Sequence, residues 1–135
     1  MMMQQEVADN YVIATGKQYS VREFIFWAAT ELGIALRFDG SGVDETAVVV
    51  RISGDKVPAV KVCDVLMRID SCYFRPAEVE TLLGDHRKAK RTLGWEPMIT
   101  AQEMCAEMVA ADLLTALRRA MLKVHELGLP VSFED

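Results

Sequence analysis

Apolar residues recur every three or four positions in two stretches of the chain. The first stretch, 20–32, is followed by Gly33, and the second begins at Thr100 and continues towards Gly128. This spacing places the apolar side chains along one side of a helix, and a glycine tolerates the left-handed backbone that ends one. We therefore predict a helix in each stretch, with the second ending before Gly128.

Both predicted helices begin with a capping box. In this motif a serine or threonine hydroxyl accepts a hydrogen bond from a first-turn N–H, and a glutamate three residues later reaches back to the cap. Ser20 with Glu23 and Thr100 with Glu103 have this spacing. We interpret Ser20 and Glu23 as a helix cap rather than as part of a functional site.

Four shorter runs are apolar or rich in β-branched residues and lack helical spacing. Such runs predict strands, and a run without a polar face predicts a buried strand. The predicted strands are 11–16, which we expect to be buried, 35–38, 47–52 and 62–69.

Two short helices are predicted between the strands and the last helix. Pro76 can open the first, over 77–83, and Asp85 is a good N-cap for the second, over 86–93, which Gly94 ends. A further helical stub is expected over 1–7. The fold class is therefore mixed α/β, with short strands and helices but no repeated strand–helix series, no G-x-G-x-x-G turn and no phosphate loop.

Composition and charge narrow the function classes. The 135 residues are 51% hydrophobic with a net charge of −5, which suits one globular region over 1–135 and argues against a nucleic-acid partner. No apolar run reaches the roughly 18 residues of a membrane span. We expect a cytoplasmic protein with no membrane partner.

The cysteines and histidines offer no metal or disulfide pattern. Cys63, Cys72 and Cys105 are odd in number and lack C-x-x-C spacing, which fits a reducing compartment. We expect each cysteine to be a small buried hydrophobe. His86 and His125 lie far apart, so no metal site is predicted.

Several strings, taken in order, resemble a known family. Residues 11–16 and 19–24 resemble the strand–turn–helix that opens the C-terminal region of extended short-chain dehydrogenases. Residues 73–85, YFRPAEVETLLGD, are similar to the corresponding stretch of the GDP-mannose 4,6-dehydratase family, and 93–95 and 103–104 continue the resemblance. It extends to about His125.

The resemblance implies a part of a two-part enzyme. Family members hold NADP in an N-terminal Rossmann domain and convert GDP-mannose to GDP-4-keto-6-deoxy-mannose, a precursor of GDP-fucose. This chain corresponds to the C-terminal substrate-binding region, and the Rossmann half with its Tyr-x-x-x-Lys pair is absent from it. We therefore expect no catalytic or cofactor-binding residue here, no activity of the chain alone, and the missing Rossmann domain or dehydratase subunits as partners.

Arg75 and Glu78 are the candidate substrate-binding residues. The resemblance implies that Arg75 contacts the diphosphate of GDP-mannose and that Glu78 accepts hydrogen bonds from ribose hydroxyls. A guanidinium binds phosphate oxygens through parallel N–H bonds, and a carboxylate only accepts. The alternative is a structural Arg–Glu pair on one helical turn, or a solvated start of the helix. The chain departs from the family pattern at Ser71-Cys72, where an arginine is usual, and at His86.

Other features have plainer interpretations. The basic cluster of 87, 88, 90 and 91 is expected to be a solvated helix face, and the methionine stripe from Met104 to Met121 is expected to belong to the core. Two alternative functions stay open. The chain could be an interaction module or remnant that associates with a full-length dehydratase, or a fragment of another nucleotide-sugar epimerase or dehydratase.

Overall fold

The computed structural model describes residues 1–57, 59–73 and 82–124. Among these residues it contains an antiparallel sheet, three α-helices and short 3₁₀ turns, which confirms the mixed α/β fold class. The helices are α1 (Val21–Glu31), α2 (Arg87–Leu93) and α3 (Ala101–Val124), and the strands are β1 (Ile34–Asp39), β2 (Thr46–Ile52) and β3 (Val65–Arg68).

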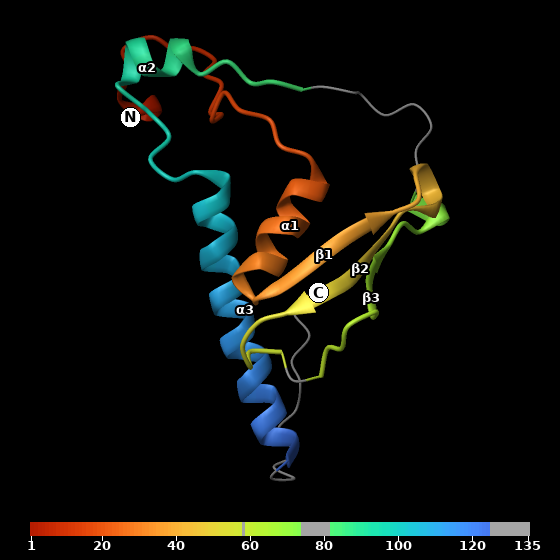
Figure 1. The fold of residues 1–135 in the computed structure, drawn as a ribbon. Coiled ribbons are helices and arrows are strands. Elements are labelled where there is room, and N and C mark those ends of the chain that lie inside the picture. The colour runs from red at the N-terminus through yellow and green to blue at the C-terminus, as the bar shows by residue number, and fades with distance from the viewer. Residues whose placement is uncertain (58, 74–81, 125–135) are drawn as a thin grey trace.

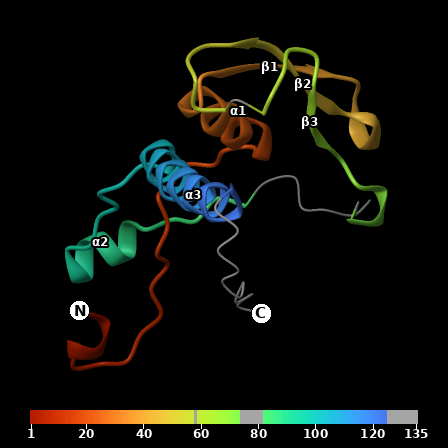
Figure 2. The same ribbon diagram turned by 90° about the horizontal axis from the view of Figure 1, so that it is seen from below.

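The sheet has the order β1-β2-β3, with both neighbouring pairs antiparallel. Ala47 in the central strand pairs with Phe38 on one side and Met67 on the other. Helix α1 packs on the sheet, and Ala29, Ile34 and Val49 form the buried core between them. Figure 2 shows α1 between the sheet and α3, so the layers are sheet, α1 and α3.

Local signals fix the ends of α1. The N–H of Ser20 donates to Glu23 Oε2 over 2.7 Å, and the N–H of Glu23 donates back to Ser20 Oγ over 3.2 Å. Gly33 follows the helix with a φ of +75° and accepts a hydrogen bond from the N–H of Ser53. The predicted capping box and glycine stop are both confirmed.

Helix α3 is twice as long as its neighbour. Its own capping box is present, with the N–H of Thr100 donating to Glu103 Oε2 over 2.8 Å. Cys105 is fully buried against α1, and its Sγ lies 3.8 Å from the carbonyl oxygen of Phe24. The helix has 24 residues whereas α1 has 11, so its second half extends past α1, as Figure 1 shows.

The prediction of a buried strand over 11–16 is wrong. The segment has no strand assignment and leaves Val12 and Ile13 about half exposed. A strand requires a neighbour for its N–H and C=O groups. Among the described residues, β1, β2 and β3 form the sheet, and none of them pairs with 11–16.

The predicted stub over 1–7 is reduced to a 3₁₀ turn, Met2–Gln4.

Two of the three cysteines also depart from expectation. Only Cys105 is buried, whereas Cys63 and Cys72 are exposed. Cys63 lies in a turn before β3 with a φ of +73°, and Cys72 lies in the 3₁₀ turn Ser71–Tyr73. Turns run over the surface, so apolar character alone does not bury a residue there.

The methionine stripe of α3 is likewise not core. Met104, Met108 and Met121 are each 45% or more exposed. The reason is geometric, because α1 covers only one side of the first half of α3 and no described element covers the second half.

In the described part of the chain no helix combines the length and apolar character that crossing a membrane requires.

Candidate functional site

The two predicted substrate-binding residues, Arg75 and Glu78, lie at 74–81, outside the described residues. Their roles stay predictions. The predicted helix 77–83 also falls largely there. Its last two residues, Leu82 and Leu83, are described and are not helical, so the prediction is wrong for them. The described residues on either side of this stretch end a 3₁₀ turn at Tyr73 and lead into α2.

Gly84 fixes the described chain just after the predicted binding stretch. A Cβ on Gly84 would lie 2.5 Å from the Cβ of Ala14 and 3.3 Å from Cγ1 of Val12. These distances are shorter than real carbon contacts allow, so the 11–16 segment crosses residue 84 at a point where only glycine fits. The chain that leaves the predicted binding stretch is thereby anchored to the N-terminal segment.

Helix α2 presents the basic cluster, and three of its four basic side chains form ion pairs. Arg87 donates to both carboxylate oxygens of Asp85, the shorter contact measuring 2.6 Å, and Asp85 also accepts from the N–H of Arg87. These hydrogen bonds lower the pKa of Asp85 to about 2. The prediction of Asp85 as the N-cap is wrong, because His86 occupies that position and the helix begins one residue later than expected. Asp85 instead precedes the cap and accepts from the first helical N–H, that of Arg87.

Two further lysines of α2 reach other segments. Lys88 Nζ lies 2.6 Å from Asp9 Oδ1 and 5.3 Å from the centre of the Tyr11 ring. Lys90 pairs with Glu96. The Lys88 contact lowers the pKa of Asp9. Three of the four basic side chains therefore hold α2 and its surroundings together on a solvated face, as expected.

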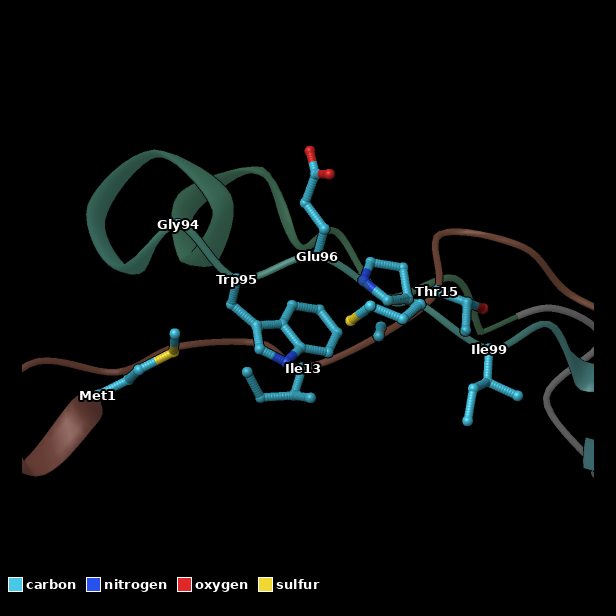
Figure 3. Close-up of a pocket in the computed structure, with 10 residues that line it drawn as sticks. Met1, Ile13, Thr15, Gly94, Trp95, Glu96 and Ile99 are labelled. Atoms are coloured by element: carbon cyan, nitrogen blue, oxygen red, sulfur yellow. The ribbon is translucent and has the colours of Figure 1, made fainter.

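An open, mainly apolar depression lies where the N-terminal segment passes the chain that follows α2. We call this depression the apolar hollow, and it is lined by Met1, Ile13, Ala14, Thr15 and 94–99. Figure 3 shows the indole of Trp95 next to Ile13, with the carboxylate of Glu96 directed away. Met98 is 94% exposed and Ile99 is 56% exposed. Large apolar side chains gathered on a surface in this way are typical of an interface.

Trp95 is held in place from α2. Gly94 ends the helix with a φ of +66°, and the N–H of Trp95 donates to the carbonyl of Ala89. The Trp95 ring makes an edge contact with His86 at a centroid distance of 6.0 Å. From the sequence alone, 95–97 is interpreted as a linker before the last helix, and this surface is not predicted. The signal was present, because Trp95, Met98 and Ile99 are more apolar than a solvated linker requires.

The described residues contain no cluster of three or more histidine, cysteine or acidic side chains that could hold a metal ion. The described residues instead place the polar helix α2 beside the apolar hollow, which no described element covers. This arrangement suits the binding of a partner rather than catalysis.

Comparison with known proteins identifies the family. The family model described as GDP-mannose 4,6 dehydratase matches residues 1–108. The chain belongs to the GDP-mannose 4,6-dehydratase family. The resemblance carried by 73–85 and the shorter strings is thus confirmed, and the alternative of another epimerase family is excluded.

Relatives with this description match nearly all of the chain. A GDP-mannose 4,6-dehydratase of Vibrio cholerae is 62% identical over 99% of the chain, and one of Yersinia enterocolitica is 52% identical over all of it. In both cases the chain spans 36% of the relative's length. GDP-mannose 4,6 dehydratase 2 of Caenorhabditis elegans is 50% identical over 83% of the chain and 26% of its own length.

The family match ends inside α3. It stops at residue 108, whereas the helix continues to Val124. The second half of α3, 109–124, therefore lies beyond the part of the chain that the dehydratase family model describes.

Proposed function

We propose that residues 1–135 form a single region, the C-terminal GDP-sugar-binding part of a GDP-mannose 4,6-dehydratase. The longer enzyme converts GDP-mannose to GDP-4-keto-6-deoxy-mannose. The observation that carries this proposal is the 62% identity to a relative of that description over nearly the whole chain, which spans 36% of that relative.

Within this region, Arg75 binds the diphosphate and Glu78 binds the ribose hydroxyls of the guanosine. A guanidinium keeps its charge at all physiological pH values and holds phosphate oxygens through two N–H groups, which a lysine cannot reproduce. The close contact at Gly84 supports the proposal, because it fixes the described chain just after these two residues.

The residues of this chain do not fit NADP. The glycine pair Gly40 and Gly42 lies in the hairpin between β1 and β2, not between a strand and a helix whose N-terminus could receive a pyrophosphate. None of the three tyrosines is followed four residues later by lysine. We therefore assign NADP to an N-terminal part of the longer enzyme, and this chain alone turns over no substrate.

The N-terminal part docks on the apolar hollow and on segment 11–16. That segment has a strand-like sequence but no strand that pairs with it among the described residues. A sheet in the N-terminal part would supply the missing hydrogen-bond partner, and its apolar face would cover Ile13, Trp95 and Met98. We place this enzyme in the cytoplasm, where three unpaired cysteines remain reduced.

A chimera tests the proposal. The matching 36% of the Vibrio cholerae relative is replaced by this chain, and product formation from GDP-mannose is followed with NADP present. We expect the chimera to form the keto-sugar and the isolated chain to form none. A folded chimera without activity would contradict the proposal, and turnover by the isolated chain would contradict the assignment of the chemistry elsewhere.

The apolar hollow also favours a second candidate, a non-catalytic module that binds a full-length dehydratase in trans. Co-purification of the chain with the intact Vibrio cholerae relative, abolished by Met98→Lys, would support it. An inactive but folded chimera together with such co-purification would favour the module over the enzyme part.

A further inference from the structure

The second half of α3 exposes an apolar face that the proposed function does not use. Five large side chains on this helix are between 44% and 63% exposed. They are Met104, Met108, Leu114, Leu117 and Met121. Three of the five lie beyond residue 108, where the family match ends. The relatives from Vibrio cholerae and Yersinia enterocolitica nevertheless align through this part of the helix.

Charge is divided between the two halves of α3. Residues 101–112 contain three acidic side chains and no basic one, and 113–124 contain three basic side chains and no acidic one. The helix dipole favours this order only within the first and last turns. Glu107 and Arg118 lie between those two turns, in the interior of the helix, so the dipole does not account for their positions.

Glu107 and Arg118 share one line along the helix. They are about three turns apart, which places both on the same side, and both are exposed. The exposed apolar residues flank this line. Met104 and Met108 lie to one side of it in the first half, and Leu114, Leu117 and Met121 lie to the other side in the second half. The apolar stripe thus crosses the charged line near the middle of α3.

We propose that α3 pairs with α3 of a second copy of this chain, antiparallel and crossed. An antiparallel pair sets the acidic half of each helix against the basic half of the other. The register that brings Glu107 of one copy opposite Arg118 of the other also brings Met104 opposite Met121. Because such a pair has twofold symmetry, each of these contacts forms twice.

The two α3 helices are expected to cross because the apolar stripe moves from one side of the charged line to the other along each helix. In a crossed antiparallel pair, each helix contacts its partner on one side in its first half and on the opposite side in its second half. This is the path that the exposed methionines and leucines take. A parallel pair would instead set Glu107 against Glu107 and Arg118 against Arg118, which is unfavourable.

Charge reversal tests this pairing. The dissociation constant of the 135-residue chain is measured by sedimentation velocity for Glu107→Arg, Arg118→Glu and the double variant, and circular dichroism verifies the helix content. We expect each single variant to weaken association about tenfold or more, because like charges then face each other twice. The double variant restores it. The control is Arg119→Glu, the same charge change on another side of the helix, which leaves association unchanged.

Several outcomes would overturn the proposal. Association through the apolar hollow would leave all four variants alike. A parallel pair would show no loss in the single variants, and a chain that stays monomeric at high concentration excludes pairing altogether. The same four variants in the active chimera show whether pairing persists beside the N-terminal part, and there they are expected to leave turnover unchanged.

Discussion

The backbone of Gly33 lies against that of Ser53 with no room for a side chain between them. A Cβ at residue 33 would fall 2.1 Å from the carbonyl oxygen of Ser53, and the φ of Gly33 is +75°. This contact joins the end of α1 to the end of β2 and closes the core.

Gly33→Ala is therefore expected to destabilise the fold strongly. Both the left-handed backbone and the collision with Ser53 act against it, and we expect a loss of roughly 2–4 kcal/mol in the free energy of unfolding. Gly54→Ala is the matched control, since its φ is +86° but its Cβ would meet open space. There we expect about 1 kcal/mol, from backbone strain alone. Equal losses in urea unfolding would show that the close approach is unimportant.

The capping boxes should contribute measurably to both long helices. Ser20→Ala removes the hydroxyl that accepts from the N–H of Glu23, and Thr100→Ala does the same for Glu103. We expect each to cost about 1 kcal/mol of stability. Thr115→Ala is a control within α3, because its hydroxyl bonds only to a carbonyl in its own helix. If the cap variants unfold at the same urea concentration as the control, the caps do not hold the helix ends.

The Asp85–Arg87 pair predicts a small acid-sensitive contribution to stability. The folded pKa of Asp85 is about 2, below its ordinary value of 3.8, so the carboxylate binds protons less readily in the folded state. The stabilisation is therefore present above about pH 4 and is lost as the pH falls towards 2. Because the pair is exposed, salt should weaken it.

Arg87→Met tests that window. The slope of unfolding free energy against pH between 4 and 2 should become shallower in this variant at low salt, and the difference should shrink at 1 M salt. Lys61→Met, at an exposed site elsewhere, is the control. An unchanged slope in Arg87→Met would mean that the pair does not couple protonation to folding.

The three cysteines should differ in reactivity. Cys63 and Cys72 are exposed, whereas Cys105 is buried and its pKa is raised mainly by burial. A thiol reagent should label the first two quickly in the native chain and the third only after denaturation. Mass spectrometry of labelled peptides gives the order directly. Early labelling of Cys105 would place α3 away from α1.

Local signals correctly predicted α1, α2 and α3 and the three strands that form the sheet. Capping boxes, Gly33 and β-branched runs act within a few residues, so no partner is needed to interpret them. The burial of segment 11–16 and of the methionine stripe of α3 was mispredicted. Burial depends on which other part of the molecule packs against a surface, and the sequence of a segment does not show this. The apolar hollow was missed because Trp95 and Met98 come from a stretch that resembles a linker when taken alone.

The central claim is that Arg75 binds the diphosphate of GDP-mannose. Its most direct test is steady-state kinetics of the active chimera with Arg75→Ala beside Arg87→Ala, an arginine that pairs with Asp85 at the surface. We expect Arg75→Ala to raise KM for GDP-mannose by about tenfold to a hundredfold, as loss of a charged phosphate contact implies, while Arg87→Ala leaves it unchanged. An unchanged KM in the Arg75 variant would contradict the account.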